Sequence, residues 1–279
     1  MVSGAGSSGS GRRLAIWIVL FVLIGFLGWQ AYVFIVGRRE FGTVEDRLPD
    51  LPPVPSLTYR REPAFPVKVW LHRVDSIERA VRMAKEYAGM EIDVVYDSAA
   101  NNFDVGHPPT PSAGISLDHL LAAVPNVSKH YFWIDFKNLT DGNARAAGAL
   151  LLSIARKYGL TSNMIVESTE PRALAGFTDS GFYTSYYLFP TSNLDSLSAE
   201  QVASYYREVK GNLASSKVNA VSMSYEDVPF ATKYFPDADI LTWYRERDHN
   251  PRYYALLAYL KRQSRVKVIL IRQMSRGYR

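Results

Sequence analysis

Two short motifs place ionisable residues two positions apart within apolar runs of the sequence. Glu91 and Asp93 stand in "EID" within "MEIDVVY", and Asp135 and Lys137 stand in "DFK" at the end of "YFWIDFK". Apolar runs of this length, rich in β-branched and aromatic residues, predict β-strands. Side chains at positions i and i+2 of a strand point to the same side. Each motif therefore directs two charged groups towards one face of its strand.

The carboxylates of Glu91, Asp93 and Asp135 form a set of hard oxygen ligands. Such oxygens suit Mg²⁺ or Ca²⁺, whereas zinc is bound mainly through thiolates and imidazoles, and this chain has no cysteine. A divalent cation at this place would hold a phosphate oxygen and stabilise negative charge in a transition state. The ammonium group of Lys137 would add a second positive charge beside the same anion. A buried ion pair between Asp135 and Lys137, with no catalytic role, is the alternative interpretation.

Two histidines lie close to these motifs in the sequence. His72 ends the apolar run "VKVWLH", and His107 follows the second strand in "FDVGHPP". Imidazoles, with ordinary pKa values of about 6.5, are suited to act as general base and general acid. Three carboxylates, one lysine and two histidines together favour cleavage of a phosphodiester. Each histidine taken alone can equally be a structural or surface residue.

Further residues at strand ends are candidates for contacts with a substrate. Glu167 lies near the end of "MIVES", and Trp243 lies near the end of "DILTWY". Tyr186 and Tyr187 occupy similar positions in "FYTSYYL". Packing in the core is the alternative role for the three aromatic residues.

These residues belong to a regular alternation of strand-like and helix-like segments. Eight apolar runs predict strands at residues 67–72, 90–96, 131–136, 164–168, 182–188, 218–225, 239–244 and 266–271. Seven segments between them predict helices, at residues 76–88, 116–124, 141–159, 170–179, 198–215, 225–235 and 250–263. Strict alternation predicts an α/β protein with a parallel sheet, and eight strands favour a closed (β/α)8 barrel of the TIM type. The last helix is expected to be reduced or absent, because the chain ends soon after the eighth strand.

The predicted barrel explains why the ionisable residues follow apolar runs. Catalytic groups in such barrels lie at the C-terminal ends of the strands. Both faces of a parallel strand are covered, so carboxylates there are buried together and require a cation or protons. No glycine-rich phosphate loop follows the first strand, which argues against a dinucleotide-binding domain.

The N-terminal region predicts a single membrane-spanning helix. Residues 14–36 contain no charge, and at about 1.5 Å per residue they form a helix of roughly 34 Å, enough to cross a bilayer. A cleaved signal peptide is the alternative, although the apolar run is long and no small-residue cleavage site follows it. Residues 1–13 are expected to be disordered, residues 37–66 to form a proline-rich linker, and residues 67–279 to form the barrel domain. Arg12 and Arg13 favour an N-terminus inside the cell and a catalytic domain on the extracytoplasmic side.

Composition narrows the classes of function further. The absence of cysteine excludes disulfides, thiolate metal sites and a cysteine nucleophile. The formal charge of +5 is mild, and the basic C-terminal residues come without a nucleic-acid motif or an aromatic stacking platform. We therefore expect no nucleic-acid partner.

The motifs resemble those of the phospholipase-C-like phosphodiesterase superfamily, which includes glycerophosphodiester phosphodiesterases and sphingomyelinase D enzymes. The shared pattern is a histidine at the end of strand one, E-x-D on strand two, a second histidine soon after, and D-x-K on strand three. The order "WLHRVDS", "EID", "HPP" and "DFKN" is most similar to the menorin family. The resemblance covers residues 67–170. It implies metal ligands at Glu91, Asp93 and Asp135, an acid/base pair at His72 and His107, and a phosphate-side lysine at Lys137.

The sequence thus predicts a membrane-anchored, Mg²⁺- or Ca²⁺-dependent phosphodiesterase. It would hydrolyse a diester, such as a glycerophosphodiester or the headgroup of a lipid or lysolipid, or form a cyclic phosphate from it. "HRVDS" departs from the H-R-G start that is usual in glycerophosphodiesterases, so the substrate stays open. The alternative function is a non-catalytic barrel that binds phosphate or sugar, or an anchored interaction module. A glycosidase with paired carboxylates is less favoured, because it has no use for Lys137 between two histidines.

Overall fold

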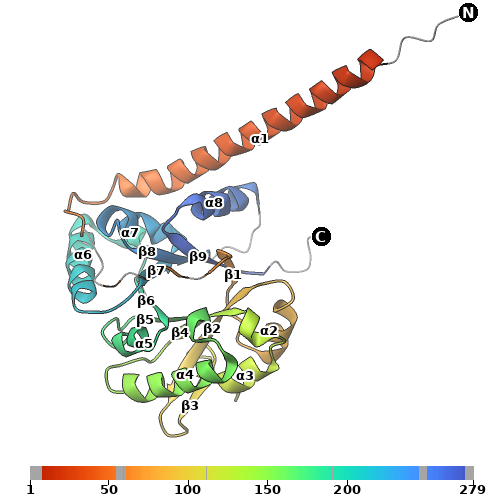
Figure 1. Cartoon of the computed structure of the whole chain (residues 1–279). Helices are drawn as coiled ribbons and strands as arrows, with labels where there is room; N and C mark the ends of the chain where they lie inside the picture. Colours follow the sequence, from red (N-terminus) through yellow and green to blue (C-terminus); the bar gives the residue numbers. More distant parts are fainter. Residues whose placement is uncertain are drawn as a thin grey trace, which may run out of the picture.

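Eight parallel strands close into a barrel, as the sequence predicts. The computed structural model describes residues 8–54, 59, 61–63, 65–110, 112–189, 192–244 and 250–273, and the side chains from residue 14 onward (Figure 1). Neighbouring strands pair in parallel around the barrel, and β1 pairs with both β2 and β9, which closes it. The barrel strands are β1 (Val69–Leu71), β2 (Gly89–Asp97), β4 (Tyr131–Phe136), β5 (Met164–Ser168), β6 (Tyr183–Tyr187), β7 (Ala220–Ser224), β8 (Asp239–Trp243) and β9 (Val266–Ile271).

Helices connect these strands at every predicted position. They are α2 (Ile77–Met83), α3 (Leu117–Ala123), α4 (Ala144–Tyr158), α5 (Ala175–Asp179), α6 (Ala199–Ala214), α7 (Val228–Tyr234) and α8 (Pro251–Arg262). Ser76, Ser116 and Ser198 cap α2, α3 and α6 by accepting backbone N–H bonds, which satisfies donors that a helix start leaves free. Within the described part of the chain, no helix follows β9.

One strand was not predicted from the sequence. β3 (Asn102–Val105) folds back antiparallel on β2, so that β2 and β3 form a hairpin beyond the barrel. Its turn is stabilised by the Asp97 carboxylate, whose Oδ1 accepts bonds from the backbone N–H groups of Ala99 and Ala100. The hairpin matters for the site because the N–H of Gly106 donates to the carbonyl oxygen of Asp93 at 3.0 Å, which fixes the loop that carries His107.

Aromatic side chains fill the interior of the barrel at the end where the strands begin. Trp70 and Trp133 are fully buried there, and the ring of Phe65 packs edge-on against Trp70 and Tyr183, with centroids 5.1 and 5.4 Å apart. Gly89 leaves room for this packing, because a Cβ at that position would lie 2.1 Å from Trp70 Cδ2. The interior of the barrel is therefore filled at the end where the strands begin.

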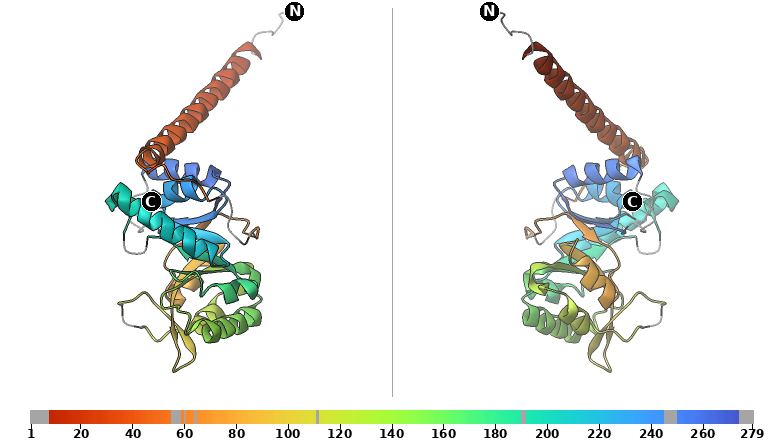
Figure 2. Two further views of the ribbon diagram at one scale, coloured as in Figure 1. Left: turned by 90° about the vertical axis from the view of Figure 1, so that its left-hand side faces the viewer. Right: turned by 90° about the vertical axis from the view of Figure 1, so that its right-hand side faces the viewer.

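The N-terminal helix is longer than expected. α1 (Ser8–Glu45) begins inside the segment predicted to be disordered and continues through the first part of the predicted linker, while residues 1–7 lie outside the described residues. Its C-terminal half lies against α7 and α8, and its N-terminal half projects away from the barrel in all three views (Figures 1 and 2). The proline-rich chain then runs along α6 and α7, where Tyr206 Oη donates to the Pro52 carbonyl and Val54 N donates to the Tyr234 carbonyl.

Candidate active site

Three carboxylates stand in one row across neighbouring strands. Parallel pairing sets Asp93 of β2 opposite Asp135 of β4, and Asp135 opposite Glu167 of β5. Glu91 points to the same face two residues earlier on β2, while Ile92 between the two belongs to the core under the helices. All four acidic side chains are buried, with exposed fractions of 1% for Glu91, 1% for Asp93, 9% for Asp135 and 2% for Glu167. Four buried acids on adjacent strands are costly unless cations offset their charge.

Glu91, Asp93 and Asp135 have the geometry of a cation site. One carboxylate oxygen from each lies within 4.8 Å of the other two. Asp93 Oδ2 is buried and has no hydrogen-bond partner among the described residues, so its lone pairs can accept a cation or a proton. Burial, followed by the charge of Asp93, raises the pKa of Glu91 well above its usual value, and burial raises the pKa of Asp135 to about 6. These directions are what like charges and desolvation produce in a cluster of buried carboxylates.

Lys137 supplies one positive charge to this cluster. Its Nζ lies 2.7 Å from Asp93 Oδ1 and also bonds to Asp135 Oδ2. Burial lowers the pKa of Lys137, but the charges of Asp135 and Asp93 outweigh burial, and the net shift is upward. The side chain is therefore an ammonium at neutral pH. One ammonium leaves Glu91 without a comparable partner, so the cluster has room for a further cation.

The strand end that carries Lys137 is held by the next residue, Asn138. Its Oδ1 accepts from the backbone N–H of Tyr96 at 2.8 Å, and its Nδ2 donates to the Tyr96 carbonyl at 2.9 Å. The carbonyl of Asn138 in turn accepts a bond from Asn143 Nδ2 at 2.7 Å. The side-chain amide of Asn138 thus links the end of β4 to β2, close to the E-x-D and D-x-K motifs.

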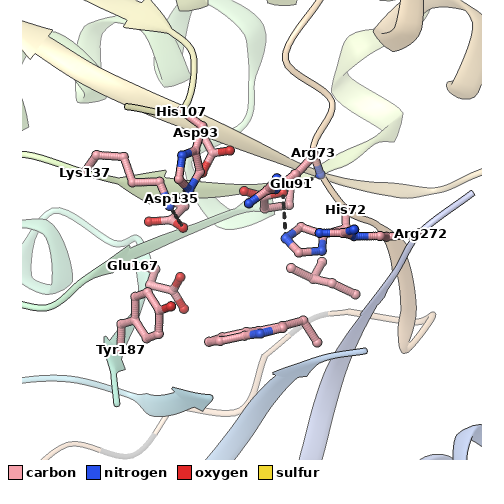
Figure 3. A pocket seen from close by; sticks show the side chains of 12 residues that line it. His72, Arg73, Glu91, Asp93, His107, Asp135, Lys137, Glu167, Tyr187 and Arg272 are labelled. Carbon is pink, nitrogen blue, oxygen red and sulfur yellow. Dashed lines mark hydrogen bonds and ion pairs between the residues drawn. The ribbon is translucent and has the colours of Figure 1, made fainter. Parts of the chain in front are cut away.

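His72 ends β1 beside Glu91. Its Nε2 lies 3.7 Å from Glu91 Oε2 (Figure 3), and its backbone N–H donates to the Ile271 carbonyl of β9 at 2.9 Å. Burial, with the charge of Arg73 as the next cause, lowers the pKa of His72 to about 3. Nδ1 of the ring is buried without a partner among the described residues.

His107 reaches the same cavity from the loop after β3. Its Nδ1 lies 2.6 Å from the Pro108 carbonyl oxygen. A carbonyl oxygen can only accept, so Nδ1 carries the proton in this contact and Nε2 is the atom left for a substrate. The two imidazoles thus come from different loops, as the sequence indicates.

All eight residues predicted for the site line one cavity of about 240 Å³ at the C-terminal ends of the strands (Figure 3). Glu167 and Trp243 form part of its wall, and Tyr187 meets Trp243 edge-on with ring centroids 5.0 Å apart. Tyr186 does not line the cavity, because its hydroxyl accepts a bond from Asn212 Nδ2 of α6 on the outer side of the barrel. The full set of lining residues is His72, Arg73, Glu91, Asp93, His107, Asp135, Lys137, Glu167, Tyr187, Trp243, Leu270 and Arg272.

Sequence reasoning missed two arginines and one aspartate of the site. Arg73 follows His72 directly and adopts a left-handed backbone, φ 59°, which turns its N–H towards Glu91 Oε2 at 2.5 Å. Arg272 follows the last strand, a position equivalent to that of His72 on β1. Asp75 lies just before α2, and its Oδ1 accepts a bond from the Asp93 N–H at 3.0 Å. Burial, with the charge of Asp93 next, raises the pKa of Asp75 to about 7.

Comparison with solved structures places this barrel among known folds. A glycerophosphodiester phosphodiesterase from Parabacteroides distasonis matches with a TM-score of 0.50 and 15% identity, over 73% of this chain and 92% of that one. The chain has the fold of the glycerophosphodiester phosphodiesterases. A phosphodiesterase from Oleispira antarctica, solved with the product sn-glycerol-3-phosphate, matches with a TM-score of 0.50 and 11% identity, over 74% of this chain and 92% of that one.

The likeness is one of structure and not of sequence. No family model matches the chain, and no curated protein matches it. The predicted resemblance to the phospholipase-C-like superfamily is confirmed at the level of the fold. The nearer similarity to the menorin family stays a prediction.

Proposed function

We propose that the chain is a divalent-metal-dependent phosphodiesterase that cleaves a glycerophosphodiester or a similar small diester. The observation that carries this proposal is the meeting of three carboxylate oxygens within 4.8 Å of one another, with Lys137 beside them and His72 and His107 in the same cavity. The shared fold with glycerophosphodiester phosphodiesterases supports the same class of reaction.

Mg²⁺ or Ca²⁺ would be held by Glu91, Asp93 and Asp135. When bound, such an ion polarises a phosphoryl oxygen and stabilises charge in the transition state. Lys137, which directly follows β4, would bind the phosphate group of the substrate. The unpartnered Oδ2 of Asp93 and the raised pKa of Glu91 support a cation at this position.

The two histidines would carry the protons. One removes a proton from the nucleophile, which is water or a neighbouring hydroxyl of the substrate, and the other protonates the leaving oxygen. A neighbouring hydroxyl would give a cyclic phosphate. Arg73 and Arg272 add positive charge to the cavity wall, which favours an anionic substrate. Glu167 and Trp243 would contact the group esterified to the phosphate.

The experiment uses the full-length chain in detergent, freed of metal with a chelator. We expect turnover of bis(p-nitrophenyl) phosphate and of glycerophosphodiesters to appear with added Mg²⁺ or Ca²⁺. Glu91→Gln and Asp93→Asn should lower that turnover by at least about a hundredfold, because a metal contributes several kcal/mol to the transition state. Glu78→Gln, at an exposed carboxylate on α2, is the matched control and should leave turnover unchanged.

The alternative, a non-catalytic binding barrel, gives a different result. It binds phosphate in a metal-dependent way, measured by calorimetry, and turns over neither the chromogenic diester nor glycerophosphodiesters. That pattern would exclude the enzymatic proposal while leaving the cation site intact.

We further propose that α1 anchors the protein in a membrane. Among the described residues it is the one helix long and apolar enough to span a bilayer. Large apolar side chains from Leu14 to Ile35 are exposed along it, which is unfavourable in water and favourable in lipid. Flotation of the full-length chain with vesicles, resistant to alkaline carbonate, tests the anchor, and the N-terminal sequence of the mature protein tests the signal-peptide alternative. The extracytoplasmic placement of the barrel stays a prediction from Arg12 and Arg13.

A further inference from the structure

The backbone of Asp93 is bonded to both of the loops that carry the histidines. Its N–H donates to Asp75 Oδ1 at 3.0 Å, and Asp75 belongs to the loop that begins with His72. Its carbonyl oxygen accepts from the N–H of Gly106 at 3.0 Å, directly before His107. One residue of β2 therefore offers a cation ligand from its side chain and holds two loops through its backbone.

β1 is too short to provide the first of these bonds. It ends at Leu71, which pairs with Met90 of β2, and the chain leaves the sheet before the level of Asp93. In a longer parallel strand, a backbone carbonyl would accept from the Asp93 N–H. Here the carboxylate of Asp75 takes that place, and it satisfies a buried donor that would be costly to leave without a partner.

The backbone that follows His72 brings Asp75 to this position. Arg73 has a left-handed conformation, φ 59°, and its N–H donates to Glu91 Oε2 at 2.5 Å. The next N–H, that of Val74, donates to the Glu91 carbonyl at 2.8 Å. Three consecutive residues therefore bond to the E-x-D segment of β2, and only the third, Asp75, does so with its side chain.

Other contacts hold this loop independently of the Asp75 carboxylate. Ser76 Oγ accepts from the N–H of Arg79 at 3.2 Å, and the guanidinium of Arg79 donates to the His72 carbonyl at 3.3 Å. Val74 is fully buried in the core. A substitution at Asp75 therefore tests the bond to Asp93, because the rest of the loop keeps its contacts.

We infer that Asp75 is a positioning residue of the proposed cation site, which holds the backbone of Asp93 in line with both imidazoles. It acts through the hydrogen bond that its oxygen accepts, and its negative charge is not required. This inference rests on the proposed function, because the cation and the acid/base roles of the histidines belong to that proposal.

Two substitutions at Asp75 separate the hydrogen bond from the charge. Asp75→Asn removes the charge and keeps an oxygen acceptor at the same distance from the backbone, whereas Asp75→Glu keeps the charge and displaces the acceptor by one methylene group. Calorimetric titration of the full-length chain in detergent, with Mg²⁺ and with Ca²⁺, measures the affinity for the cation. We expect Asp75→Glu to raise the Kd by about 10- to 100-fold, the usual cost of losing a residue that orients a metal ligand, and Asp75→Asn to raise it by no more than about threefold.

Amide exchange and kinetics provide two further measurements. In the metal-free chain, the Asp93 amide should exchange faster with solvent in Asp75→Glu and at a nearly native rate in Asp75→Asn. At saturating cation, Asp75→Glu should lower kcat for a glycerophosphodiester by about 10², with a smaller change in KM, because the cation and the imidazoles lose their alignment. If Asp75→Glu does not fold, Asp75→Ala, which removes the acceptor without adding volume, takes its place with the same expected results.

Asp227 in η4 (Tyr225–Asp227) provides the matched control. It is buried, and its Oδ1 accepts from the N–H of Leu194 at 2.6 Å, so it makes the same kind of bond but does not line the cavity. Asp227→Glu should lower the free energy of unfolding without changing the Kd for the cation or kcat. A loss of cation affinity in Asp227→Glu as large as that in Asp75→Glu would overturn the inference, because general destabilisation would then explain both.

The order of the two Asp75 variants decides the inference. If Asp75→Asn loses cation affinity as much as Asp75→Glu or more, the charge acts at the site and the inference is wrong. If both variants keep the native Kd, kcat and amide exchange, the bond does not position the site and the inference is also wrong. A native chain that binds neither cation contradicts the proposed function and this inference with it, whereas a native chain that binds a cation and cleaves the diester, with unchanged variants, contradicts the inference alone.

Discussion

Asp93 and Asp135 lie directly opposite each other on β2 and β4, and the Nζ of Lys137 bonds to both carboxylates. One ammonium thereby partly neutralises two buried acids, and Glu91 beside them is a third buried acid. The three carboxylates lie close enough together to bind the divalent cation that we propose. The two motifs E-x-D and D-x-K have to be in register for this to occur, and parallel pairing of β2 with β4 provides that register.

Lys137→Met should affect both catalysis and the stability of the metal-free protein. Loss of the ammonium leaves Asp93 and Asp135 buried without their partner, which costs about 3 kcal/mol, and loss of its contact with the anion should lower kcat by about 10²–10³. Added Mg²⁺ or Ca²⁺ should recover more stability in the variant than in the native chain. Urea unfolding with and without metal, together with steady-state kinetics, measures both effects.

The control for Lys137→Met is Lys157→Met on α4. Lys157 pairs with Asp118 at 2.8 Å on the protein surface, where an ion pair contributes little. It should change neither turnover nor the response to metal. Similar losses in the two variants would mean that charge in general, and not the position between two carboxylates, explains the effect.

His72→Asn and His107→Asn should each reduce turnover of a glycerophosphodiester by about 10²–10⁴. A substrate with a good leaving group, such as bis(p-nitrophenyl) phosphate, needs little help from a general acid. It should therefore rescue the variant that lacks the acid and not the one that lacks the base, which assigns the two roles. His119→Asn, on the exposed start of α3, is the matched control. Equal rescue of both variants would contradict a division of labour between the imidazoles.

The barrel could be predicted because its signals are local and repeated. Each strand is an apolar run of four to eight residues, and three of the seven helices follow a capping serine, so eight runs and seven helices are readable without contacts. The site followed from the same reading, because the C-terminal ends of parallel strands share one edge. Eight predicted residues, from His72 to Trp243, indeed line one cavity.

The residues that were missed depend on contacts between distant parts of the chain. Arg272 is adjacent to His72 only because β9 closes the barrel against β1, and a tail rich in arginine gives no sign of this. β3 is a strand of four residues whose pairing partner, and not its own sequence, makes it a strand. α1 extends to Glu45, and its last turns pack on α8, where Phe41 stacks on Tyr259. The composition of the predicted linker does not indicate this contact.

Asn138→Ala should lower stability and turnover together. The substitution leaves the N–H and the carbonyl of Tyr96 without their partners, and an unsatisfied buried group costs about 1–3 kcal/mol. Because Asn138 follows Lys137, the ammonium should also lose its fixed position, and kcat should fall while KM changes less. Asn163→Ala removes two similar amide bonds, to the carbonyls of Ser128 and His130, at the opposite end of the barrel. It should cost stability without changing kcat, and a loss of kcat there would contradict the argument.

Asp239, at the start of β8, should make the stability of the fold depend on pH. Burial raises its pKa above the ordinary value of 3.8, although the hydroxyl of Tyr183 and the ammonium of Lys267 oppose the shift, with Glu62 and Arg265 nearby. The folded state then binds more protons than the unfolded state, so this group's contribution to stability is lost as pH rises through the interval above 3.8. Asp239→Asn removes the titration. The difference in unfolding free energy, variant minus native, should therefore become more positive between about pH 4 and pH 7, whatever its constant offset, and urea unfolding across that range measures it. A difference that stays constant or falls with pH would show that the carboxyl titrates normally.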